Sequence, residues 1–115
     1  VADGMGGHNA GEVASRIAGE TALARLIARP RNERPEDAVR AAVAAAHAAV
    51  VAEGSRSRAS RGLGTTLVVL FARKGRFVVG HVGDSRAYLV RAYELRPVGL
   101  YLPGTPVSNA TGAQG

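Results

Sequence analysis

Apolar side chains recur at helical spacing in the first half of the chain and form continuous or alternating runs in the second half. In the first half, this pattern predicts one helix over about residues 10–28 and another from about residue 36 to just before residue 54. Residues 29–35 contain two Pro and predict a connector between the helices. The apolar positions that define the two helices are Val13, Ile17, Ala24 and Ile27 in the first, and Val39, Val43, Ala46 and Val50 in the second.

The second half of the chain reads as strands that follow a polar loop over residues 54–62. Residues 65–72 are β-branched or apolar and predict a buried strand. Lys74-Gly75 predicts a hairpin turn into a strand over residues 76–82, and the segments 86–91 and 93–98 predict further short strands. Residues 99–115 show no period and predict a poorly ordered tail. Helices followed by hairpin-linked strands favour an α+β fold over alternating βαβ units.

The composition narrows the function classes. The net charge is +6, but the Arg residues are scattered and aromatic residues make up only 4% of the chain, which argues against a nucleic-acid partner. The chain has no Cys, so a disulfide framework, a thiolate nucleophile and a Cys-based zinc site are excluded. No apolar run is long enough for a membrane segment and no signal peptide is recognisable. We therefore expect a cytoplasmic protein.

Candidate chemistry lies at two of the three Asp residues. Asp3 and Asp84 each lie where a predicted strand meets a Gly-containing turn, whereas Asp37 lies at a predicted helix start. A carboxylate next to Gly lets Mg²⁺ or Mn²⁺ reach both carboxylate and main-chain carbonyl oxygens. Asp3-Gly4 fits this description. The alternative is that Asp3 only caps the turn, because Asp-Gly is a common turn dipeptide.

Other common sites do not fit the sequence. The Gly-rich segment before the first helix has Asn9 where a dinucleotide fingerprint needs Gly, and no P-loop motif occurs. Ser85 is not a nucleophile elbow, because Ala87 replaces the second flanking Gly. His47, in the Ala-rich second helix, is expected to be structural, and His81, on an apolar strand, is expected to be a hydrogen-bonded histidine of the core or the sheet edge. The pattern leaves the role of His8 open.

Three blocks of sequence, in order, resemble the bacterial type 2C metal-dependent Ser/Thr protein phosphatases. The first is VADGMGGH at residues 1–8 with GEVAS at residues 11–15. The second is GTTLV at residues 64–68, and the third is VGDSRAYL at residues 82–89. One such block is a weak signal, but three in order are specific. The resemblance extends from residue 1 to about residue 98.

The resemblance implies part of a four-layer αββα sandwich, with two antiparallel sheets flanked by helices and Mg²⁺ or Mn²⁺ ions at one edge. On that analogy Asp3 is the catalytic residue that bridges two ions, the Gly4 carbonyl binds one of them, and Asp84 helps to hold an additional ion. A metal-bound hydroxide would hydrolyse phosphoserine or phosphothreonine, so phosphorylated proteins would be the partners.

The departures from the family pattern concern the completeness of the site. The acidic ligand and the phosphate-contacting Arg that precede the Asp-Gly motif in the family are absent, and no Asp follows Asp84. We therefore expect a phosphatase fragment truncated at both ends, with residues 1–98 as a partial domain and residues 99–115 as a divergent tail, that is inactive alone. The alternative is a non-catalytic module that binds phosphoproteins or another partner. Exposed sheet edges predict self-association.

Overall fold

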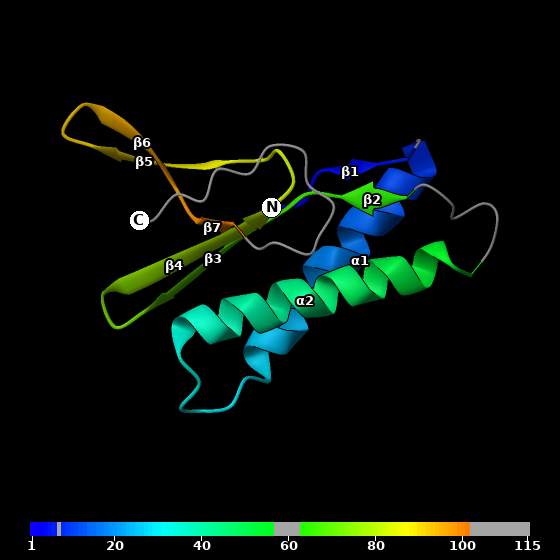
Figure 1. Cartoon of the computed structure of the whole chain (residues 1–115), viewed down its shortest axis with the longest axis horizontal. Coiled ribbons are helices and arrows are strands. Elements are labelled where there is room, and N and C mark those ends of the chain that lie inside the picture. Colours follow the sequence, from blue (N-terminus) through cyan, green and yellow to red (C-terminus); the bar gives the residue numbers. More distant parts are fainter. Residues whose placement is uncertain (7, 57–62, 102–115) are drawn as a thin grey trace.

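Helices lie on one side of the β3–β4 hairpin, and the β5–β6 hairpin lies on its other side (Figure 1). The structure, a computed structural model, describes residues 1–6, 8–56 and 63–101. The helices are α1 (His8–Ile27) and α2 (Pro35–Gly54). The strands are β1 (Gly4–Met5), β2 (Gly64–Thr65), β3 (Leu67–Arg73), β4 (Arg76–Val82), β5 (Ala87–Arg91), β6 (Glu94–Val98) and β7 (Leu100–Tyr101). This order confirms the predicted α+β class.

The strands pair in three groups within the described residues. β1 pairs with β2, β5 pairs with β6, and a further sheet has the order β3-β4-β7. All of these pairings are antiparallel except β4 with β7, which is parallel. Lys74 and Gly75 form the predicted hairpin turn, with φ angles of 52° and 76°. The same left-handed conformation recurs in the β5–β6 turn, at Ala92 and Tyr93, with φ angles of 50° and 70°.

The sequence-based boundaries differ from the structure in two instructive places. The strand expected over residues 65–72 is divided at Thr66, because Gly64–Thr65 pair with β1 whereas the chain from Leu67 onward pairs with β4. The Gly-rich segment expected to be a turn contributes β1. Most of the predicted tail, from residue 102 onward, and residues 57–62 of the predicted loop lie outside the described residues.

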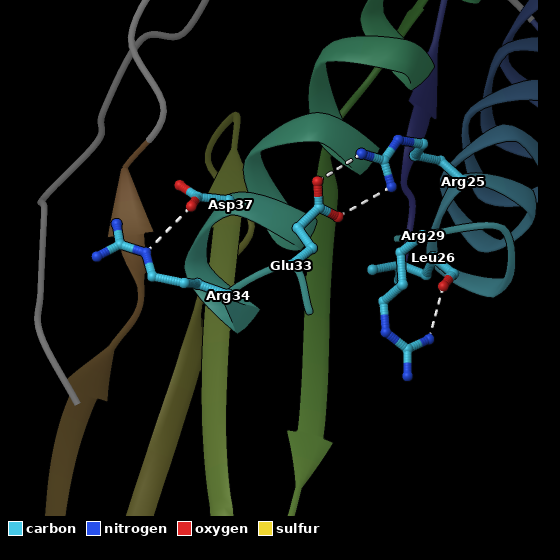
Figure 2. A network of polar contacts seen from close by, with 6 residues as sticks. All are labelled: Arg25, Leu26, Arg29, Glu33, Arg34 and Asp37. Carbon is cyan, nitrogen blue, oxygen red and sulfur yellow. Dashed lines mark hydrogen bonds and ion pairs between the residues drawn. The ribbon is translucent and has the colours of Figure 1, made fainter. Parts of the chain in front are cut away.

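Ion pairs hold the connector between α1 and α2 (Figure 2). Arg25 donates from both terminal nitrogens to Glu33, at 3.0 Å to Oε1 and 2.7 Å to Oε2. These hydrogen bonds raise the pKa of Arg25 above its ordinary value. Arg34 Nε donates to Asp37 Oδ2 at 3.1 Å, which raises the pKa of Arg34 in the same way. The Arg25–Glu33 pair thus joins the end of α1 to the connector, and the Arg34–Asp37 pair joins the connector to the start of α2.

Arg29 joins the end of α1 to the sheet. Its Nη1 donates to the carbonyl oxygen of Leu26 at 2.7 Å (Figure 2). Its guanidinium carbon lies 4.8 Å from the centroid of the Phe71 ring on β3, within the range of a cation–π contact. Arg29 therefore covers one end of the layer between helix and sheet.

The core lies between the helices and one face of the β3–β4 hairpin. Val39 and Val43 of α2 are fully buried, and Leu67, Val69 and Val82 meet them from the sheet. The buried side chains that α1 contributes to this core are small and let the helix approach closely: Ala18 and Ala22. Leu26 of α1 also packs against the core, but it is only partly buried. The buried side chains of this core are all aliphatic, and Phe71 packs against them only as a partly buried ring, so the stability of the layer depends on close packing of small groups.

The other face of the β3–β4 hairpin is covered only in part. Its side chains and those of the β5–β6 hairpin line a hollow of about 410 Å³. We call this surface the open face; its members are Val68, Leu70, Ala72, Phe77, Val79, Ala87, Tyr88, Leu89 and Val98. Leu70 is 64% exposed and Tyr88 is 47% exposed. Neither of the described helices is long and apolar enough to cross a membrane.

Candidate metal site

Two glycines bring β1 into backbone contact with the first turns of α1. A Cβ on Gly4 would overlap the carbonyl oxygen of Gly11, and a Cβ on Gly11 would lie 3.0 Å from the Gly4 carbonyl carbon. Both partners are backbone, so no change of rotamer relieves such a contact. The pair of glycines therefore fixes the distance between the Asp3-Gly4 segment and the helix.

Hydrogen bonds hold the segment before β1 against the start of β3. Thr66 N–H donates to the Asp3 carbonyl oxygen at 3.0 Å, and Val68 N–H donates to the Val1 carbonyl oxygen at 2.7 Å. In return, Asp3 N–H donates to the Thr66 hydroxyl oxygen at 3.1 Å. The backbone of Asp3 is thus engaged on both its N–H and its C=O, while its side chain is exposed.

Thr66 also connects this segment to the Gly-Asp-Ser-Arg motif. Its hydroxyl oxygen lies 2.7 Å from the Ser85 hydroxyl oxygen, a hydrogen bond in which either atom can donate. Gly83, at a φ of 89°, lies so close to Thr66 that an added Cβ would be 2.5 Å from the Thr66 Cγ2. Thr66 itself is 2% exposed. The three sequence blocks that carried the resemblance therefore meet at one buried threonine.

The Asp3 side chain borders a hollow of about 500 Å³ that is open to solvent. The lining residues are Ala2, Asp3, Gly4, Met5, Gly11, Glu12 and Ser15. Asp84 is exposed at the end of β4 and does not line this hollow. Asp3 and Gly4 thus line one hollow, whereas Asp84 follows β4, next to the Ser85 that bonds Thr66.

The oxygen donors at this hollow suit Mg²⁺ or Mn²⁺ in kind, because both ions prefer carboxylate and carbonyl oxygens. Asp3 and Glu12 bring carboxylates, and Gly4 brings a carbonyl. They fall short in number: among the described residues, no group of three or more His, Cys, Asp or Glu side chains is placed to hold a metal ion. The metal roles of Asp3, Gly4 and Asp84 stay predictions.

Sequence reasoning assigned no role to several residues of this region. Glu12 and Ser15 lie three residues apart at the start of α1, and that spacing, which places side chains on one helix face, was the available signal. Thr66 gave no local signal, since its partners are 63 and 19 residues away. His81 is buried on β4, as expected, and His47 is half-buried on α2. The side chain of His8 lies outside the described residues.

Known proteins match almost the whole described chain. The sequence profile of the protein phosphatase 2C family matches residues 1–100. The serine/threonine protein phosphatase PstP of Mycobacterium tuberculosis is 39% identical over 101 residues, which cover 85% of this chain and 19% of PstP. The serine/threonine phosphatase Stp of Listeria welshimeri is 37% identical over 99 residues, which cover 84% of this chain and 39% of Stp.

Solved structures agree with the sequence matches. A crystal structure of the M. tuberculosis phosphatase PstP/Ppp superposes with a TM-score of 0.73 at 40% identity, over 84% of this chain and 41% of that one. The catalytic domain of PstP in complex with two manganese ions superposes equally well, with a TM-score of 0.73 at 41% identity, over 84% of this chain and 42% of that one. The chain spans less than half the length of each of these relatives. On the match over residues 1–100, the chain belongs to the protein phosphatase 2C family.

Proposed function

We propose that this chain is part of a metal-dependent protein Ser/Thr phosphatase, to which it contributes Asp3, the Gly4 carbonyl and Asp84 as ligands of Mg²⁺ or Mn²⁺. The observation that carries the proposal is the hydrogen-bonded link from Asp3 through Thr66 to Ser85, which joins the three sequence blocks. The named relatives are Ser/Thr phosphatases, and one of their structures holds two manganese ions. Phosphoserine and phosphothreonine proteins are the proposed substrates.

The residues of this chain would act by holding and orienting. When bound, such ions activate water and neutralise the charge that develops on phosphate. Asp3 offers its carboxylate on a segment whose backbone is fixed by Thr66 and by the Gly4–Gly11 contact, so the ligand is presented by a rigid support. The Ser85 hydroxyl is engaged with Thr66, which fits a site that uses no protein nucleophile.

The donor set within the described residues suggests that the isolated chain does not catalyse. Two carboxylates and a carbonyl cannot fill the six positions or so that Mg²⁺ prefers. We therefore propose that activity needs further ligands. The second candidate function is a phosphatase-like module that binds phosphoproteins without hydrolysis. It is supported by the same incomplete set of metal ligands.

Manganese binding tests the site without requiring activity. We expect weak binding of Mn²⁺ by the purified chain, measured from the electron paramagnetic resonance signal of the free ion. Asp3→Ala removes a carboxylate at the hollow and should weaken binding at least about tenfold, since even residues behind the ligands matter that much. Asp37→Ala is the matched control, because Asp37 pairs with Arg34 away from the hollow. Equal affinity of the two variants would contradict the site.

Hydrolysis separates the two candidate functions. We expect no release of phosphate from a phosphothreonine peptide by the isolated chain with Mn²⁺. Peptide binding that depends on the phosphate group, without hydrolysis, would favour the binding module. Hydrolysis that Asp3→Ala abolishes would refute the proposal that the chain is inactive alone and would support the phosphatase assignment.

We also propose that the isolated chain self-associates through the open face. The support is its apolar exposure: Leu70, Phe77 and Tyr88 are all substantially exposed on one surface. Surfaces of this kind are commonly covered by a partner. The cytoplasmic location expected from the sequence stays a prediction.

A further inference from the structure

A second pocket, of about 150 Å³, lies between α1, α2 and the strands on the helix side of the sheet. It shares no lining residue with the hollow at Asp3. Its walls are mostly apolar and include Ala18, Val43, Ala46, Val50, Leu67 and Val82. The pocket is thus a separate cleft of the helix–sheet layer, partly open to solvent at Val51, which is 53% exposed.

The pocket follows from the small side chains of the two helices. Ala18 of α1 and Ala46 of α2 are both buried and both line it, so at these positions each helix brings only a methyl group. A void between apolar walls forfeits dispersion contacts that a guest molecule of the right size would restore. Dry apolar cavities of about 150 Å³ are known to bind benzene, so the volume suits a single aromatic ring.

One wall of the pocket is polar. His47, half-buried on α2, lines it, and its side chain makes no hydrogen bond to another described residue. The only other side-chain polar group of the lining is the Thr65 hydroxyl, which already donates to the Thr66 carbonyl oxygen at 2.7 Å. An imidazole at the wall offers a ring nitrogen to a guest with one hydroxyl group.

We propose that this pocket is a binding site for a small, neutral, single-ring molecule with one hydroxyl group, a phenol in chemical class. The ring packs against the apolar walls, and the hydroxyl bonds to His47. This proposal stands apart from the proposed phosphatase function and does not depend on metal.

A guest in the pocket should also affect the backbone of the Asp3 segment. Gly64 and Thr65 of β2 line the pocket, and the same two residues pair with Met5 and Gly4 of β1. A guest that packs against β2 should stabilise the pairing of β2 with β1. The Thr66 N–H, which donates to the Asp3 carbonyl oxygen, is the reporter, and we expect its hydrogen exchange to slow when the guest is bound.

Ligand-detected NMR with phenol and toluene, together with amide spectra of the full chain, tests the site. We expect phenol to bind with a Kd of about 1 mM or tighter. Toluene should bind about fivefold more weakly, because it lacks the hydrogen bond. Amide shifts should centre on Val43, Ala46 and Val82. Binding of neither probe, or shifts confined to the open face, would overturn the proposal.

Matched variants locate the guest. Ala46→Leu fills the pocket and should abolish binding of both probes, whereas Ala48→Leu, on the exposed side of the same helix, should leave binding unchanged. If Ala46→Leu does not fold, Val51→Phe serves instead, because Val51 lines the pocket and is 53% exposed, so it tolerates a larger ring. Undiminished phenol binding in the folded pocket variant would refute the site.

His47→Leu tests the polar wall. We expect toluene to bind this variant as it binds the parent chain, within about twofold, and the preference for phenol to disappear. A preference that survives His47→Leu would show that the hydroxyl is recognised elsewhere, and the assigned chemical class would be wrong.

Discussion

The two faces of the β3–β4 hairpin carry similar side chains but have different neighbours. On the helix side, Leu67 and Val69 are buried under α2. On the open face, Leu70 and Phe77 remain 64% and 45% exposed, although the β5–β6 hairpin lies across that side (Figure 1). Apolar residues on both faces of a strand are typical of a sheet that is covered twice. The apolar pattern of the hairpin thus predicts packing on both of its faces, and within the described residues only the helix side is fully packed.

This difference shows that the apolar pattern of a strand does not by itself determine which of its faces is buried. The pattern of β3 alone does not say which of its faces has found a partner, because both read as core. The helices decide it, since their apolar stripes pack against one face. Variants on the two faces should therefore differ sharply in effect.

The largest expected effect is at the centre of the helix side. Val39→Asp places a carboxylate where the parent side chain is fully buried, which should cost at least about 3 kcal/mol and abolish the cooperative thermal transition. Val90→Asp, at a site 72% exposed on β5, should change the free energy of unfolding by no more than about 0.5 kcal/mol. Similar melting curves for the two variants would contradict the comparison.

The Gly4–Gly11 contact should be the next most sensitive point. Gly4→Ala forces β1 away from α1 and should cost about 2 kcal/mol, read from chemical denaturation. It should also weaken Mn²⁺ binding. Gly19→Ala is the control, because nothing lies within 4 Å of its added Cβ on α1, and it should stabilise the helix by up to about 1 kcal/mol. A neutral Gly4→Ala would mean that β1 is not held by this contact.

Self-association should respond to the open face alone. Leu70→Lys removes one exposed leucine from that face and should weaken the association at least about tenfold, measured by sedimentation equilibrium. Leu23→Lys changes a leucine of similar exposure on α1 and should leave the association constant unchanged. If Leu23→Lys had the stronger effect, the interface would lie on the helices instead.

The smallest expected effect concerns the Arg25–Glu33 ion pair, which joins α1 to the connector between the helices. Glu33→Gln breaks a bidentate pair whose side chains are 28% and 16% exposed, so the melting temperature should fall slightly, and less so in high salt. Glu20→Gln, in the exposed pair with Arg16, should show no change. A salt-independent loss in Glu33→Gln would point to packing of the side chain as its main contribution.

The sequence predicted those features that depend on neighbouring residues. The helices follow from apolar spacing, and the hairpin turn at Lys74-Gly75 follows from the glycine that tolerates a positive φ. It missed β1, because Gly-rich segments read as turns and the partner strand is some 60 residues away. It missed β7 for the same reason, since a parallel pairing of Leu100 with Gly80 leaves no local pattern.

In the candidate site, too, the sequence predicted what depends on neighbouring residues and missed what depends on distant ones. The Asp-Gly pair and the Gly-Asp-Ser-Arg block were recognisable by their residues, but the Thr66 hydroxyl that links them emerges only when distant segments meet. That Asp3 lines the hollow and Asp84 does not was equally beyond a reading of the sequence. Family resemblance supplied roles for these residues, and only metal-binding measurements will test them.

The turn at Ala92 and Tyr93 has a consequence for the order of folding. Both residues occupy the left-handed region without the freedom of glycine, and Tyr93 is fully exposed. Each such residue costs roughly 1 kcal/mol or more, and an isolated hairpin is marginal in water. We expect β5–β6 to close last during folding and to open first, so that a protease would cut the chain near residue 92 while the helix side stays intact.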